Sequence, residues 1–240
     1  MRQLTSFIKK EWTEALRTGK LTILSILFVL FGIMNPAIAK LTPWMMELMA
    51  KSLEETGLTV TAVEVNDLTS WTQFYKNLPI AMIVFLLMYG GIFTAEYQKG
   101  TLVHMVTRGM KRWKIMIAKA ITMALFWTAG YWLMYAITYG YNAYFWGNHT
   151  ASNTGFAAAC FYLLGLRLIS LILLMSSFQK TSSAVLLLTG ATFAGTYLLS
   201  LLPNLKKYLP VQLMNSAALL GGVSNPSDYR WALIITAACI

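Results

Sequence analysis

Charged residues are scarce in this sequence. Only 12% of its 240 residues are Asp, Glu, Lys or Arg, whereas a soluble globular domain has about 25%. Hydrophobic residues make up 57% of the chain, and they occur in long blocks. A helix that crosses the hydrocarbon core of a bilayer needs roughly 20 mainly apolar residues. The shortage of charge therefore excludes an ordinary soluble domain and predicts an integral membrane protein with an all-α, polytopic fold.

Residues suited to metal or disulfide chemistry are also scarce. The two cysteines, Cys160 and Cys239, lie in separate apolar runs, and two isolated cysteines make neither a disulfide framework nor a metal site. The two histidines, His104 and His149, are far apart and lack the spacing of metal ligands. We therefore expect no metal and no cofactor.

The sequence lacks a nucleotide-binding P-loop, which would require G-x-x-x-x-G-K-[ST]. The nearest fragment is Gly19-Lys20, with Glu14 where the first glycine should stand. The apolar runs also lack acidic residues, which disfavours an ion-coupled transporter, and they lack histidines for intramembrane hydrolysis. The chain is thus not expected to be an enzyme, and a secondary transporter or channel is kept as the alternative function.

Apolar runs place the predicted spans within a single transmembrane domain, 1–240. Five runs are long enough to cross, and a sixth is only ten residues, or about 15 Å as a helix. We expect this last run to be a truncated sixth span. The polar stretches 40–77 and 203–230 are predicted to be extracellular loops. The spans are expected at about 21–39, 78–95, 115–139, 156–178 and 183–202, with 231–240 as the partial span.

Residues 1–20 show the periodicity of an amphipathic helix. Apolar residues recur at steps of three and four, whereas the charged residues fall mostly elsewhere. This pattern favours a helix that lies in the membrane interface. The predicted apolar face comprises Leu4, Phe7, Ile8, Trp12, Ala15 and Leu16.

The distribution of basic residues predicts the orientation. With the N-terminus inside, the inner segments hold twelve Lys and Arg residues and the outer segments hold six. The positive-inside rule then favours a cytoplasmic N-terminus. The net charge of +10 is explained by this topology and by contact with membrane lipid, so no nucleic-acid partner is expected.

The segment 96–119 between the second and third spans is unusually basic. It contains one acid, Glu96, and six bases: Lys99, Arg108, Lys111, Arg112, Lys114 and Lys119. Gly100 is placed to end a helix, Thr101 to cap a short new helix, and Gly109 to end that helix before the third span. The segment 96–114 is therefore predicted to hold a short amphipathic helix on the cytoplasmic face, clamped between two spans.

This pattern resembles the ABC-2 type permease family, the membrane subunits of ATP-binding-cassette exporters. The resemblance rests on Glu96, the run Gly100-Thr101-Leu102, a basic residue near Arg108 or Arg112, and Lys119 at the entry to a span. It extends over most of the chain, from an amphipathic "elbow" helix through six spans. The segment Gly109-Met110 departs from the family, in which proline or serine is frequent at this position.

The resemblance implies a permease that is driven by a separate ATPase subunit and pairs with a second permease subunit, in a homodimer or heterodimer. The ATPase would dock on the coupling segment and on the elbow helix. The residues that it implies for coupling are Glu96, Gly100, Thr101, Leu102, Arg108 and Arg112. The expected setting is a bacterial cell membrane, and the expected cargo is a peptide or drug.

Arg167 lies near the middle of the predicted fourth span. A charged residue at this depth costs about 2.5–3.5 kcal/mol on insertion scales. It is a candidate for the translocation path or a subunit interface. Snorkelling, or pairing with a backbone carbonyl, is the equally weighted alternative.

Overall fold

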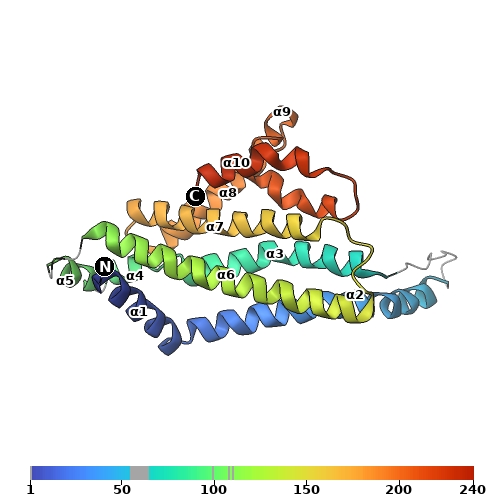
Figure 1. Cartoon of the computed structure of the whole chain (residues 1–240), viewed down its shortest axis with the longest axis horizontal. Coiled ribbons are helices and arrows are strands. Elements are labelled where there is room, and N and C mark those ends of the chain that lie inside the picture. Colours follow the sequence, from blue (N-terminus) through green and yellow to red (C-terminus); the bar gives the residue numbers. More distant parts are fainter. Residues whose placement is uncertain (1, 55–64, 99, 108, 110) are drawn as a thin grey trace.

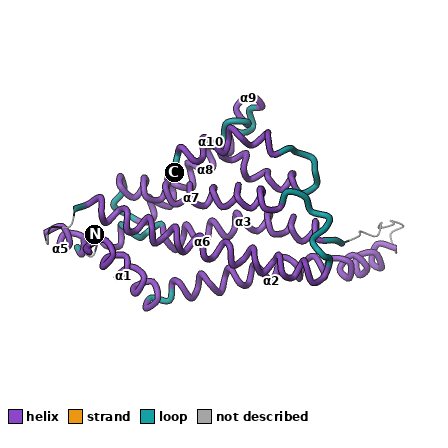
Figure 2. Tube along the Cα trace, in the orientation of Figure 1, coloured by secondary structure: helices purple, strands orange, loops and turns teal. Residues whose placement is uncertain are grey.

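The computed structural model describes residues 2–54, 65–98, 100–107, 109 and 111–240. Every regular element within these ranges is helical (Figures 1 and 2). In chain order they are α1 (Arg2–Arg17), α2 (Lys20–Glu54), α3 (Asp67–Tyr89), α4 (Thr94–Gln98), α5 (Thr101–Thr107), α6 (Arg112–Phe145), α7 (Thr154–Phe178), α8 (Ser182–Leu199), α9 (Pro203–Lys206), η1 (Pro210–Leu219), η2 (Pro226–Tyr229) and α10 (Arg230–Ala238).

Five helical stretches in the described part of the chain are long and apolar enough to cross a membrane. They are Lys20–Ala50, Asp67–Gln98, Arg112–Phe145, Thr154–Phe178 and Ser182–Leu199. The prediction of an all-α polytopic bundle is confirmed. The run expected to form part of a sixth span is α10, whose 9 residues correspond to roughly 14 Å, less than half of the hydrocarbon core.

Helix boundaries differ from the predicted spans at the ends of two helices. The helix α2 continues to Glu54, far beyond the predicted end at residue 39, and α3 begins at Asp67 instead of residue 78. Much of the predicted loop 40–77 is therefore helical. The helix ends differ from the predicted span ends because hydropathy locates only the apolar part of a helix. Backbone hydrogen bonds allow the same helix to continue through polar residues. Residues 55–64 of that loop lie outside the described part.

The predicted loop 203–230 is also more structured than expected. It contains α9, η1 and η2, and η1 packs against α7, α3, α8 and α10. Leu213 and Leu219 of η1 are fully buried, and Ser152 donates its backbone N–H to the carbonyl of Leu220. The turn residues of this stretch indicated a loop, but its apolar residues fill space beside α7.

Aromatic side chains of α6 form the contact with α7. Trp127 and Tyr131 are fully buried, and their polar atoms donate to backbone carbonyls of α7 at 3.2 and 2.7 Å. Gly165 of α7 lies directly against the Trp127 ring, and a Cβ added there would be 1.9 Å from the nearest ring atom. The two helices can approach this closely only because position 165 carries no side chain.

An uncharged polar cluster joins α2, α3 and α6 within the bundle. Asn77 donates to the Asn35 side chain at 2.7 Å, and the Thr138 hydroxyl donates to the carbonyl of Gly32 at 3.0 Å. Asn35 and Thr138 are fully buried and lie 3.5 Å apart. These three side chains, Asn35, Asn77 and Thr138, are called the neutral cluster below.

Candidate functional site

The helix α1 lies at the end of the bundle that also holds α4, α5 and the start of α6 (Figure 1). Phe7 is buried there in a small apolar cluster with Phe93, Ile115 and Ala118. The predicted apolar face of α1 is thus only partly buried, because Trp12 and Leu16 are exposed.

One acidic residue of α1 lies on its buried face. Glu11, which the periodicity assigned to the polar side of the helix, is only 7% exposed. Glu11 therefore departs from the general pattern, in which the charged residues of α1 fall mostly outside its apolar face. The reason is that oppositely charged groups from α4 and α6 meet Glu11, and the local sequence of α1 cannot show them.

Four side chains from three helices form a closed ring of ion pairs. Lys10 of α1 contacts Glu11 at 3.1 Å and Glu96 of α4 at 2.8 Å. Lys119 of α6 contacts the other carboxylate oxygens of Glu11 and Glu96, each at 3.1 Å. Each carboxylate therefore bridges both ammonium groups. Lys10, Glu11, Glu96 and Lys119 are called the ion-pair ring below.

The ring is electrically balanced, and three of its four groups are buried, whereas the Lys10 side chain is 40% exposed. Lys119 is 1% exposed, and the two carboxylates are nearly as inaccessible. The Lys119–Glu96 contact is ionic without the alignment of a hydrogen bond, whereas Lys119 does donate to Glu11. Because a buried charge without a partner is strongly destabilising, the three buried charges of Glu11, Glu96 and Lys119 are tolerable only while the three helices stay together.

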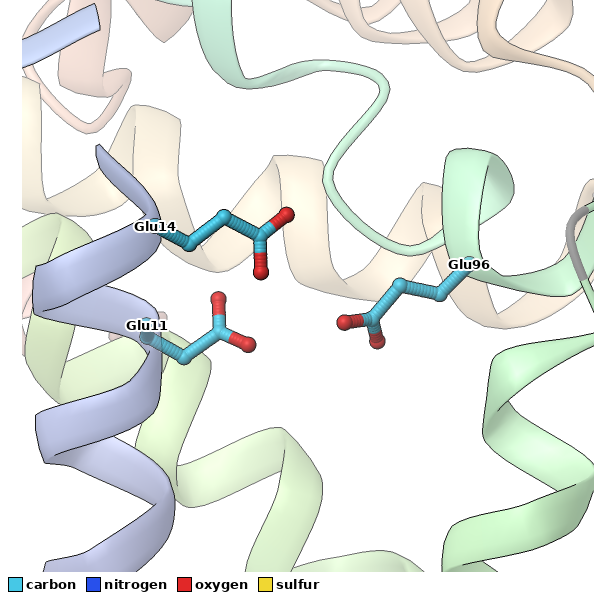
Figure 3. A group of neighbouring side chains, drawn as sticks. All are labelled: Glu11, Glu14 and Glu96. Carbon is cyan, nitrogen blue, oxygen red and sulfur yellow. The ribbon is translucent and has the colours of Figure 1, made fainter. Parts of the chain in front are cut away.

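Glu14 lies beside Glu11 and Glu96 (Figure 3) and extends the ring through Lys10, the ring member that is exposed. Its carboxylate lies 2.8 Å from the Lys10 ammonium, and this hydrogen bond holds the pKa of Glu14 below its ordinary value. Burial by itself would lower the pKa of Lys10, but hydrogen bonds to Glu14 and Glu96 outweigh burial and raise it. Both shifts favour the charged forms.

Glu11, Glu14 and Glu96 point toward one another in Figure 3, and one oxygen from each lies within 4.8 Å of the others. Distances of this kind also occur around metal ions. Here the ammonium groups of Lys10 and Lys119 lie among the carboxylates and already neutralise most of their charge. The donor set therefore fits lysine counter-ions and not a metal ion.

The coupling segment turns sharply at two glycines. Gly100, after α4, has a φ of +67°, and Gly109, after α5, has a φ of +82°, values that glycine adopts without the cost of a Cβ. The predicted helix breaks at both positions are confirmed. Thr101 is the first residue of α5, and its hydroxyl donates to the backbone carbonyl of Glu96 at 3.3 Å. This bond secures the last turn of α4.

The structure brings together most of the residues implied for coupling. Glu96 belongs to the ion-pair ring, and Thr101 lies directly behind it. Leu102 and Arg112 line an adjoining pocket between α5, α6 and α7. Arg108 lies outside the described residues.

Arg167 lies elsewhere, on α7 beside the last residues of α10. One of its guanidinium nitrogens, Nη1, is buried without a hydrogen-bond partner, while its side chain also interacts with Cys239. No acidic residue in the described ranges forms an ion pair with it.

The sequence did not indicate Lys10 and Glu11 as site residues. They lie 86 and 85 positions before Glu96, and a single sequence offers no local signal for contact over that separation. The only available hint was the combination of adjacent opposite charges in α1 with a lysine, Lys119, inside an otherwise apolar run.

Comparison with known proteins identifies the family. A family model described as "ABC-2 family transporter protein" matches residues 5–219. The chain belongs to this family. The ABC-2 match covers α1 to η1 and so includes the ion-pair ring, the coupling segment and all five candidate spans.

One relative of this ABC-2 protein is the uncharacterized transmembrane protein YxlG of Bacillus subtilis (strain 168). It is 22% identical over 250 residues, which cover all of this chain and 93% of the relative. No solved structure gives a significant match. The family and the five apolar helices together make the chain a multi-pass membrane protein of an ABC transporter, of the permease type.

Proposed function

We propose that this ABC-2 protein is the permease subunit of an ATP-driven exporter, powered by a separate ATPase subunit that docks on residues 98–112 and on α1. In this proposal the N-terminus is cytoplasmic, as the distribution of basic residues favours. The expected setting is a bacterial cell membrane, and the expected cargo is a peptide or drug.

The ion-pair ring is the observation that carries this proposal. A coupling element must be connected rigidly to the spans that it moves. Glu96 connects α4 to Lys10 of α1 and to Lys119 of α6, with contacts of 2.8 and 3.1 Å. A force applied to α1 or to the coupling segment would therefore reach α6 through charged contacts.

The turn at Gly100 gives the segment a suitable shape. Between Gly100 and Gly109 the chain forms α5, a single short helix of 7 residues. Leu102 packs toward the apolar cluster at the base of α1, while Thr101 contacts Glu96. Docking of a partner on α5 would thus press on both the cluster and the ring.

A second permease subunit is part of the proposal. Of the five candidate spans, α8 has the smallest share of buried residues. Gly190 and Gly195 of α8 each have no neighbour within 4 Å of an added Cβ, so this chain leaves the backbone of α8 open to close helix packing at both positions. A homodimer or heterodimer would cover it, and Arg167 is retained as a candidate for the path or the interface.

Co-purification from native membranes tests the docking. The tagged chain is isolated in mild detergent, and P-loop ATPases that accompany it are quantified by mass spectrometry. The double variant Leu102→Ala/Arg112→Glu should release the ATPase, whereas the control variant Lys206→Glu, at the predicted outer side, should retain it. Recovery of the permease without an ATPase, or equal release by both variants, would contradict the proposal and favour a transporter not powered by an ABC ATPase.

A further inference from the structure

A pocket of about 260 Å³ lies beside the ion-pair ring, between the coupling segment and the bundle. Its walls come from the turn before α4, from α5, from the first turns of α6 and from the end of α7. Phe93, Leu102, Ile115 and Leu173 give it a largely apolar interior. The pocket is partly open to the surroundings, so it is accessible to a ligand with an apolar chain.

One wall of the pocket contains a hydroxyl group with no partner. Ser176 of α7 is 3% exposed, and its Oγ forms no hydrogen bond. A serine inside a helix commonly donates to a carbonyl three or four residues earlier, as the neighbouring Ser177 does to Leu174 at 2.6 Å. Because a buried polar group without a partner is costly, the Ser176 hydroxyl points to a polar group that is supplied by a ligand.

The rim of the pocket is positively charged. Arg112, the first residue of α6, lines the pocket and is exposed. The preceding residue, Lys111, makes no side-chain hydrogen bond to cap the helix. Free backbone N–H groups at a helix start and a neighbouring guanidinium both favour an anion.

The position of the pocket indicates which anion. The start of α6 and the end of α7 are two ends of candidate spans, so the rim lies at the level of lipid headgroups and the apolar interior at the level of the upper acyl chains. Basic pockets between membrane helices are typical binding sites for anionic headgroups. The positive rim of the pocket, its position at the level of the headgroups and its apolar interior all suit an anionic lipid.

We propose that this pocket binds one anionic phospholipid, with its phosphate at Arg112 and an ester oxygen at Ser176. An acyl chain of the same lipid enters between α5 and α7. The lipid would then hold the coupling segment against the bundle next to the ion-pair ring. This inference depends on the membrane location of the chain and not on docking of an ATPase.

Native mass spectrometry of the purified full chain tests the proposal without any ATPase. Phosphatidylglycerol and phosphatidylcholine with identical acyl chains are titrated in turn, and the fraction of protein with one bound lipid is measured. We expect saturable binding with a preference for phosphatidylglycerol. Arg112→Gln should weaken phosphatidylglycerol binding about fivefold, the effect of one base near an anionic surface. Ser176→Ala should weaken the binding of both lipids about two- to tenfold, the effect of one hydrogen bond.

Two matched controls separate a built site from general surface charge. Lys180→Gln removes an exposed base at the same end of the bundle, outside the pocket. Ser177 also lines the pocket, but its hydroxyl already donates to the carbonyl of Leu174, so Ser177→Ala removes no hydroxyl that a lipid could use. Both should bind lipid like the unmodified chain. Equal binding of the two lipids, equal effects of Arg112→Gln and Lys180→Gln, or equal effects of Ser176→Ala and Ser177→Ala would each overturn the proposal. Thermal melts in detergent confirm that all four variants are folded.

Discussion

The ion-pair ring and the neutral cluster perform the same structural task with different chemistry. Each joins three helices through polar side chains that are mostly buried: the ring joins α1, α4 and α6, and the cluster joins α2, α3 and α6. The ring uses full charges near the end of the bundle. The cluster uses amides and a hydroxyl within the spans.

The difference follows from the cost of burying charge. Interhelical hydrogen bonds between neutral groups in membranes contribute about 0.6 kcal/mol on average, and losing one is tolerable. An ion pair contributes little net free energy against its desolvation, but loss of one partner leaves a buried charge and is severe. Separating the helices that carry the ring is therefore costly. This suits helices that must move as a unit.

The largest effect is expected from Lys119→Met. This change leaves Glu11 and Glu96 buried with one ammonium group between them, so it should lower the free energy of unfolding by about 3–5 kcal/mol. Thermal unfolding in detergent measures the effect. Lys111→Met, which removes an exposed base about two helix turns before Lys119, is the control. Equal melting temperatures for the two variants would mean that the ring does not hold the three helices.

A steric change in α7 should have the next largest effect. In Gly165→Ala the new methyl group would overlap the Trp127 ring, and such overpacking costs about 1–3 kcal/mol. Gly155→Ala is a matched control on the same helix, since an added Cβ there meets nothing within 4 Å. Thermal melts of both variants provide the comparison. If Gly165→Ala is as stable as Gly155→Ala, α6 and α7 do not pack closely enough at position 165 to exclude a side chain.

The neutral cluster should tolerate loss of a partner better than the ring does. Asn77→Ala breaks the 2.7 Å hydrogen bond to Asn35, and the coupling energy of the pair should be about 0.6 kcal/mol and at most about 1.7 kcal/mol. A double-mutant cycle with Asn35→Ala, measured by denaturation in mixed micelles, gives this energy. A loss of stability in Asn77→Ala as large as that in Lys119→Met would remove the contrast between the two regions.

The smallest effect concerns pH at Glu14. Its pKa is lowered in the folded state, first by the hydrogen bond from Lys10, so its contribution to stability is present above its ordinary pKa of 4.5 and is lost as the pH falls through the folded value. Because this carboxylate is half exposed, the contribution is only about 0.3 kcal/mol, as for a solvent-exposed pair. The difference in stability between the unmodified chain and Glu14→Gln should shrink between pH 5 and pH 3. A difference that is constant with pH would exclude the Lys10 contact.

Much of the fold is predictable from the sequence, because hydropathy alone locates the apolar runs of all five candidate spans. The ends of α2 and α3 are not predictable in this way. A helix such as α2 continues past the apolar region as long as its backbone hydrogen bonds are made, and Asn66, which accepts a hydrogen bond from Thr69, begins α3 well before the apolar run.

The site is predictable only in part. Glu96 and the glycines at 100 and 109 follow from local pattern and from the family resemblance. The partners of Glu96 do not, because Lys10 lies 86 residues away and α1 by itself shows a simple amphipathic pattern. The unpaired hydroxyl of Ser176 is not predictable from the sequence either, since a missing hydrogen bond is a property of the packed structure.

Site-specific photo-crosslinking tests the coupling role of this end of the bundle most directly. A photoreactive amino acid replaces either Lys111 or Tyr144, two exposed residues near opposite ends of α6. The chain is irradiated in native membranes, and crosslinked partners are identified by mass spectrometry. We expect a crosslink to a P-loop ATPase from position 111 and none from position 144. A crosslink from position 144 alone, or no ATPase crosslink from position 111, would contradict the coupling role.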